Sequence, residues 1–289
     1  MVFEDLVSPE SAKNHPLKLL FIGIGFSILS VLFSLWVFKQ EASLVMVFLV
    51  VVMVMPLMYF TLKEEEEEDL SYRQELWVLK EHMKAVKFLL YLFIGFVIGF
   101  SLFYLLLPDH TIRELFGMQL RTIENINSNI ISGKNVGFGT LVSILNNNFR
   151  VLLFCLLFAF FFGAGSIFIL AWNASVISAA VGTYFRNALS DYAHLIGFTK
   201  GAIYLNLFVA GILRYMIHGV FEIAAYFVGA LAGGIISMAA VNSSYRMLKY
   251  KRIISDVTVL ILIAAGLLII GGLIEVYITP LLSSTIHGR

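Results

Sequence analysis

The fold is decided by one long apolar stretch, residues 201–241, with the sequence GAIYLNLFVAGILRYMIHGVFEIAAYFVGALAGGIISMAAV. A helix that spans a bilayer needs about 20 mostly apolar residues, so this stretch is too long for a single span. His218 and Gly219 stand near its middle and interrupt the apolar run. We therefore predict two spans that meet at this point.

The composition of the whole chain also indicates a membrane protein. Of its 289 residues, 60% are hydrophobic and 13% are charged, whereas soluble domains average about 45–50% and about 25%. A net charge of +1 provides no concentrated basic surface, which argues against nucleic acid as a partner. Cys155 is the only cysteine, so an internal disulfide and a multi-cysteine metal cluster are excluded.

Five further apolar stretches are long enough to cross a bilayer. They are residues 17–38, 44–62, 88–107, 149–172 and 257–278, and Lys39–Glu41 makes a tight turn between the first two. Together with the two spans in residues 201–241, they predict an all-α, polytopic transmembrane helical bundle of about seven spans.

The longest non-spanning segment, residues 109–148, has a helical pattern of its own. Its apolar residues recur at helical spacing, namely Ile112, Leu115, Phe116, Leu120, Ile123, Ile126 and Ile130. The pattern predicts an amphipathic helix that lies on the membrane surface. We expect a short second helix to lead from there into the next span.

Polar side chains mark the predicted ends of the span at residues 149–172. Asn146, Asn147 and Arg150 stand at its entrance, where amides and a snorkelling guanidinium suit the membrane interface. Asn173 stands at its far end and matches a glycosylation sequon. We discount that use because the residue lies at or in the membrane.

The distribution of basic residues predicts the orientation, because cytoplasmic segments carry an excess of Lys and Arg. The seven-span arrangement puts the N-terminus and residues 63–87, 186–200 and 242–256 on one side. That side holds 13 of the 20 basic residues, against six on the other. We therefore predict a multi-pass protein of the cell membrane with a cytoplasmic N-terminus and an external segment at residues 109–148.

Four ionisable residues fall inside predicted spans, where a charge costs about 2.5 kcal/mol or more at the bilayer centre. They are Arg214, His218, Glu222 and Glu275. On a continuous helix the spacing of four residues puts the first three on one narrow face. We weigh three uses: a buried polar network that locks helices together, a proton or ion relay, and a metal site formed by His218, Glu222 and Glu275.

Several of these residues belong to motifs that resemble the stage II sporulation protein M family. The motifs are Asn146–Asn147 before a span, the pair Gly163 and Gly165, the element HGVFE at residues 218–222, and Ile274–Glu275 followed by Thr279–Pro280. The resemblance covers roughly residues 88–282. We therefore predict an added N-terminal unit, residues 1–69, with two spans and an acidic loop, and a core membrane domain at residues 70–289.

The resemblance implies a function as well as a fold. Sporulation members are membrane components of an envelope-remodelling complex with peptidoglycan-cutting partners, and are not thought to be enzymes themselves. We therefore predict a non-enzymatic scaffold or partner subunit without a cofactor, and the resemblance implies that His218, Glu222 and Glu275 matter. Alternatives are a small transporter or channel lined by the buried Arg/His/Glu cluster, and a metal-dependent intramembrane enzyme.

Expected partners are the lipid bilayer and other membrane or envelope proteins. The spacing of Gly229 and Gly233 forms a G-x-x-x-G pattern, which lets helices approach closely. We expect it to serve packing within one chain, with a homodimer seam as the less favoured use.

Overall fold

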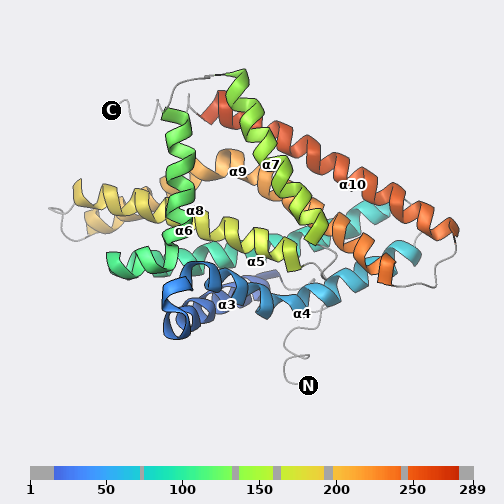
Figure 1. The fold of residues 1–289 in the computed structure, drawn as a ribbon, viewed down its shortest axis with the longest axis horizontal. Coiled ribbons are helices and arrows are strands. Elements are labelled where there is room, and N and C mark those ends of the chain that lie inside the picture. The colour runs from blue at the N-terminus through green and yellow to red at the C-terminus, as the bar shows by residue number, and fades with distance from the viewer. Residues whose placement is uncertain are drawn as a thin grey trace.

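The computed structural model describes residues 16–71, 75–131, 137–158, 164–191, 198–241 and 247–279, and all the elements within these ranges are helical (Figure 1). Seven of the helices are long and apolar enough to cross a membrane. The prediction of an all-α, polytopic bundle of about seven spans is confirmed. The spans are Leu17–Val37, Lys39–Met58, Lys87–Leu106, Phe138–Phe158, Ile167–Asn187, Ile217–Ile236 and Ile253–Ile278.

The described helices follow one another with short connections. They are α3 (Pro16–Val37), η1 (Lys39–Glu41, a 3₁₀ turn), α4 (Ala42–Ser71), α5 (Glu75–Leu106), α6 (Asp109–Ile131), α7 (Phe138–Phe158), α8 (Ala164–Asp191), α9 (Phe198–Val241), α10 (Met247–Leu273) and η2 (Ile274–Ile278, a π turn). Pro108 separates α5 from α6, because proline has no backbone N–H with which to continue a helix.

Small residues bring α3 and α5 into backbone contact. A Cβ on Gly23 would lie only 2.7 Å from the carbonyl oxygen of Leu92, and a Cβ on Gly95 would lie 2.9 Å from the Cα of Gly23. One turn further along, Gly99 faces Ser27. Membrane helices associate through such small-residue seams because lipid provides no hydrophobic drive for helix pairing.

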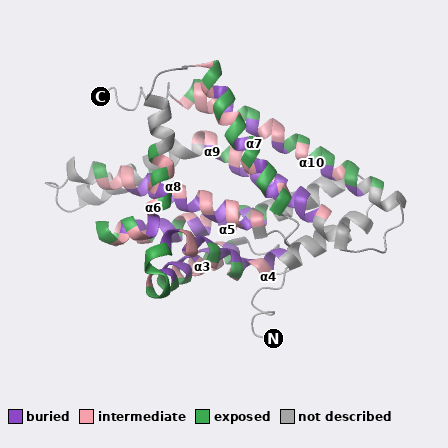
Figure 2. Cartoon of the chain, viewed as in Figure 1, coloured by how far each residue is buried: buried purple, intermediate pink, exposed green. Residues whose placement is uncertain are grey.

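One hydrophobic core extends across α3, α4, α5, α6, α8 and α9 and reaches the start of α10. Its largest fully buried side chains are Phe88, Phe93, Phe96, Phe100, Phe116 and Phe227. Figure 2 shows the buried positions of these helices in purple. The N-terminal spans share this core, and the division of the chain at residues 69 and 70 stays a prediction.

The predicted amphipathic helix is α6. Ile112, Leu115 and Phe116 are buried, while Arg113 and Arg121 are exposed. The helix bends at Phe116, and its second half runs across the direction of α5 and α8 (Figure 1).

A buried glutamine holds α6 against its neighbours. Ser43 Oγ donates a hydrogen bond to Gln119 Oε1 over 2.7 Å, and Gln119 Nε2 donates to Ser175 Oγ over 3.0 Å. This amide therefore joins α6 to both α4 and α8.

Two predicted span boundaries are wrong. The predicted break at His218 and Gly219 does not occur, because α9 continues from Phe198 to Val241. The predicted span at residues 149–172 is instead divided between α7, which ends at Phe158, and α8, which begins at Ala164. The helix α9 continues through Gly219 because one glycine inside a helix costs about 1 kcal/mol, whereas broken backbone hydrogen bonds in lipid cost several kcal/mol each.

The side of the membrane predicted for one segment is also wrong. Arg186 near the end of α8 forms an ion pair with Asp109 at the start of α6, with Nη2 and Oδ1 3.0 Å apart. The end of α8 therefore lies at the same end of the bundle as the α5–α6 junction. Residues 186–200 and the segment that begins at Asp109 were predicted on opposite sides, whereas Arg186 and Asp109 lie at the same one.

Candidate functional site

A hydrogen bond between side chains of two spans forms the centre of the candidate site. Asn148 of α7 donates from Nδ2 to Oε1 of Glu222 on α9 over 2.6 Å. The Asn148 side chain is buried, with 5% exposure, and Glu222 is half-buried. Hydrogen bonds between polar side chains of neighbouring spans hold membrane helices together, so this contact fixes α7 against α9.

Two glycines of α10 let this helix approach the same place. A Cβ on Gly271 would lie 3.3 Å from Cγ of Glu222 and 3.3 Å from Cβ of Phe221. A Cβ on Gly272 would lie 3.0 Å from Cδ2 of Leu145 on α7. Because neither glycine has a side chain, α10 contacts α9 and α7 at the level of the Asn148–Glu222 bond.

A second carboxylate lies at the end of α10. Glu275 belongs to the π turn η2 and is close enough to Glu222 for the two groups to interact electrostatically. The buried Tyr226 is close enough to interact with both carboxylates. Two carboxylates in apolar surroundings repel each other unless donors or a shared proton intervene, and Asn148 supplies one such donor. Single π turns inside α-helices occur frequently at functional sites.

An apolar cluster lies next to this group. It consists of Leu152, Cys155, Ala225, Tyr226, Ala264 and Leu268, which come from α7, α9 and α10. These three helices therefore also pack against one another, with the polar group of Asn148, Glu222 and Glu275 at one end of their shared contact. We refer to it as the three-helix unit.

The structure brings the predicted ionisable cluster together only in part. Glu222 and Glu275 are close enough to interact electrostatically. The Nδ1 atom of His218 is buried and has no hydrogen-bond partner among the described residues, and His218 does not bond Glu222. The side chain of Arg214 lies outside the described residues. Within the described part of the chain, no group of three or more His, Cys, Asp or Glu side chains is placed to hold a metal ion.

The polar-network hypothesis sought the partner of Glu222 among the ionisable residues of the spans, and the partner is Asn148. The sequence contains a signal for this residue, because Leu141, Asn148, Leu152 and Cys155 recur on one face of a helix. All four are buried. The signal was missed because the span was predicted to begin at Phe149, which placed Asn148 outside the membrane.

The other predicted entrance residues have different surroundings from those expected. Asn146, Asn147 and Arg150 are exposed and lie inside α7, which begins at Phe138. Asn147 Nδ2 donates to Asn148 Oδ1 over 3.4 Å. Asn173 donates from Nδ2 to the carbonyl oxygen of Ile169 over 2.8 Å, a bond within α8.

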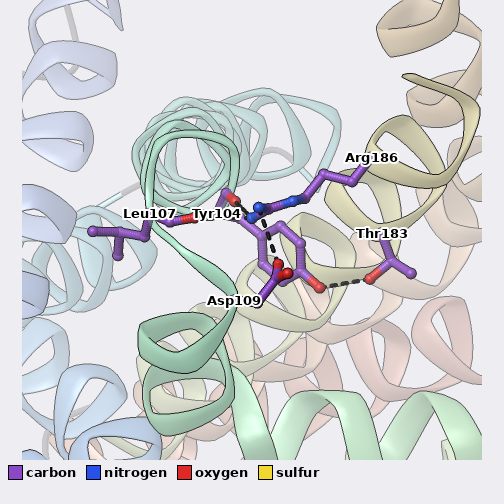
Figure 3. Close-up of polar contacts among 5 residues, drawn as sticks. All are labelled: Tyr104, Leu107, Asp109, Thr183 and Arg186. Carbon is purple, nitrogen blue, oxygen red and sulfur yellow. Dashed lines mark hydrogen bonds and ion pairs between the residues drawn. The ribbon is translucent and has the colours of Figure 1, made fainter. Parts of the chain in front are cut away.

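Sequence reasoning also missed a second polar cluster, between α5, α6 and α8 (Figure 3). Arg186 Nη1 donates to the carbonyl oxygens of Tyr104 and Leu107 over 3.1 and 2.9 Å, and Nη2 pairs with Asp109. The hydroxyls of Tyr104 and Thr183 share a hydrogen bond of 2.6 Å. Arg186 thus satisfies backbone carbonyls left free at the end of α5, and the cluster fastens α8 to the α5–α6 junction.

The sequence model of one protein family, described as Stage II sporulation protein M, matches residues 88–280. The chain belongs to the stage II sporulation protein M family. Neither a curated protein nor a solved structure matches the sequence. The match contains the whole three-helix unit and the Arg186 cluster, whereas α3, α4 and the first part of α5 precede it.

The fold explains how the motifs of this stage II sporulation protein M family member relate to one another. Asn147 donates to Asn148, Asn148 donates to Glu222 of the HGVFE element, and Glu222 interacts with Glu275. Three motifs that are far apart in the sequence therefore meet in the three-helix unit.

Proposed function

We propose that this multi-pass membrane protein is a non-enzymatic scaffold or partner subunit of an envelope-remodelling complex. The observation that supports the proposal is the hydrogen bond between Asn148 and Glu222. A transporter or a metal-dependent enzyme would need the Glu222 carboxylate for an ion or a metal. Here that carboxylate joins two helices instead, which is the use that polar residues have in packed membrane bundles.

The proposed orientation has a cytoplasmic N-terminus. With residues 186–200 moved to the opposite side, the N-terminal side holds 11 basic residues: Lys13, Lys18, Lys63, Arg73, Lys80, Lys84, Lys87, Arg246, Lys249, Lys251 and Arg252. The other side holds seven: Lys39, Arg113, Arg121, Lys134, Arg186, Lys200 and Arg289. The remaining two, Arg150 and Arg214, are counted on neither side. The smaller excess still supports a cytoplasmic N-terminus.

The substitution Glu222→Gln tests the proposed function. Glutamine keeps the shape of the side chain and an acceptor oxygen for Asn148, but it cannot carry a proton or bind a metal as a carboxylate does. In a strain that lacks the protein, we expect Glu222→Gln to restore the cell envelope as well as the wild type does. Fluorescent labelling of newly made cell wall measures the recovery.

A parallel measurement in proteoliposomes addresses transport. Purified wild type and Glu222→Gln should give the same proton and cation leak in response to an imposed gradient. If Glu222→Gln fails to restore the envelope although it is folded and abundant, and a flux carried by the wild type disappears with it, the scaffold proposal is wrong and a relay is the better description.

A further inference from the structure

The span in α7 has unusual surroundings for its composition. Only 17% of its residues are buried, whereas the other six spans range from 28% to 67%, and Figure 2 shows exposed positions along most of α7. A span that faces lipid on most sides needs an apolar surface. The span in α7 is nevertheless less apolar than those of α3 and α10, which are the next least buried.

The exposed side of α7 has a regular seam. Residues separated alternately by four and three positions lie along one line of a helix, as in helices that pack against a partner helix. The line opposite the buried face consists of Gly139, Ser143, Asn146, Arg150, Leu153 and Leu157, and all six are exposed. Its first three residues are small or polar, the fourth is the charged Arg150, and the last two are leucines. We call these six residues the outward seam.

Arg150 is the residue that lipid alone does not accommodate. At a rise of 1.5 Å per residue it lies about 18 Å from Phe138 and about 12 Å from Phe158 along the helix axis. It forms no ion pair or hydrogen bond with another residue of the described ranges. Arginine side chains inside spans are rare and pair with other groups.

We infer that the outward seam docks a transmembrane helix of another membrane protein, one that carries an Asp or Glu at the level of Arg150. The inference rests on the proposed function as a partner subunit and assigns the surface and the chemistry of the contact. Gly139 and Ser143 allow the two backbones to approach, and the amide of Asn146 adds a donor and an acceptor next to the ion pair.

A second copy of this chain fits the outward seam poorly. Two copies related by a two-fold axis would place Arg150 opposite its counterpart, and facing like charges are unfavourable. In the described interior of the spans the carboxylates are Glu222, Asp256 and Glu275, and none of them is exposed. The charge of Arg150 therefore calls for a carboxylate from a different protein.

Model transmembrane peptides test the inference with the full-length protein. The probe is a fluorescent Leu/Ala helix of spanning length with one central Asp, and its control has Leu at that position. In liposomes of neutral lipid, energy transfer should report association of the Asp peptide with the wild type. Arg150→Leu should weaken it roughly tenfold, as expected for one polar contact between membrane helices. Phe149→Leu, a change beside the seam, should not.

Several results would overturn the inference. Equal association of the Asp and Leu peptides, or Asp-peptide binding unaffected by Arg150→Leu, would show that the seam does not recognise a carboxylate. Efficient disulfide formation between two copies of Ser143→Cys, in a Cys155→Ser background, would identify a second copy as the occupant. Retention of anionic lipid in native mass spectrometry, lost on Arg150→Leu, would identify lipid.

The strain used for Glu222→Gln separates this inference from the proposed function. Arg150→Leu should fold and reach wild-type abundance, because it removes an unpaired charge, yet fail to restore the envelope. Full restoration by both Arg150→Leu and Glu222→Gln would end the docking inference and leave the scaffold proposal intact.

Discussion

Replacing Asn148 by leucine removes the donor of the Glu222 carboxylate and changes the side-chain volume little. The lost bond is short, 2.6 Å, and it leaves a half-buried carboxylate without this partner. Leaving such a group unsatisfied costs about 1–3 kcal/mol. We therefore expect Asn148→Leu to lower the free energy of unfolding of the three-helix unit by about that amount.

The single cysteine provides the assay. Cys155 is fully buried on the same face of α7 as Asn148, so its labelling by a thiol reagent during a denaturant titration reports the opening of this unit. Asn147→Leu is the matched control, because Asn147 is exposed and makes only a 3.4 Å contact with Asn148. It should leave the labelling midpoint nearly unchanged.

A double-mutant cycle makes the test specific to the pair. Glu222→Leu alone leaves the Asn148 amide without its acceptor, whereas the double variant leaves neither group without a partner. The double variant should therefore lose less stability than the two single changes added together. Equal midpoints for Asn148→Leu and Asn147→Leu, or strict additivity in the cycle, would refute the claim that this hydrogen bond holds α7 to α9.

Three further predictions concern the rest of the bundle. Gly95→Ala should destabilise the protein by about 1–3 kcal/mol in thermal unfolding, because the methyl group meets the backbone of α3. Gly25→Ala should not destabilise it, because a methyl group there meets nothing within 4 Å. Equal effects of the two changes would contradict the close packing of α3 and α5. Arg186→Ala should lower the unfolding midpoint more than Asp109→Asn, since Asp109 is exposed and surface ion pairs contribute about 1 kcal/mol or less; the reverse order would contradict the role of the carbonyl contacts. In a Cys155→Ser background, an impermeant thiol reagent should label Asn187→Cys and Asn129→Cys from outside and Glu66→Cys and Lys251→Cys from the cytoplasm; labelling of Asn187→Cys with Lys251→Cys would contradict the revised topology.

The sequence was sufficient to predict the fold class, because it follows from the length of the apolar stretches. The number of spans also agrees, but only because one span fewer in residues 201–241 offsets one more in α7 and α8. The sequence was not sufficient to divide residues 149–184 and 201–241 correctly. Both are apolar throughout, and hydropathy does not locate a helix break within such a stretch. His218 and Gly219 resembled an interruption, but continuing α9 through one glycine is cheaper than breaking backbone hydrogen bonds in lipid.

The candidate site, like the fold, could be predicted only in part. An ionisable group inside a span needs a partner, and this was enough to single out Glu222 and Glu275. The identity of the partner depended on where α7 begins. Once the helix starts at Phe138, Asn148 moves into the membrane and onto the face that meets α9. The contacts of Arg186 depend on which helix ends are adjacent, and span prediction does not provide this.

A disulfide that locks α9 to α10 tests the central claim, that the three-helix unit serves as a fixed scaffold. A Cβ at position 271 would lie 3.3 Å from the Cβ of Phe221, near the usual separation of about 3.5–4.5 Å in disulfides. Phe221→Cys with Gly271→Cys, in a Cys155→Ser background, should therefore cross-link readily and leave Asn148, Glu222 and Glu275 unchanged. The oxidised protein should restore the envelope as well as the reduced one does, whereas loss of function on oxidation alone would show that the unit must move to work.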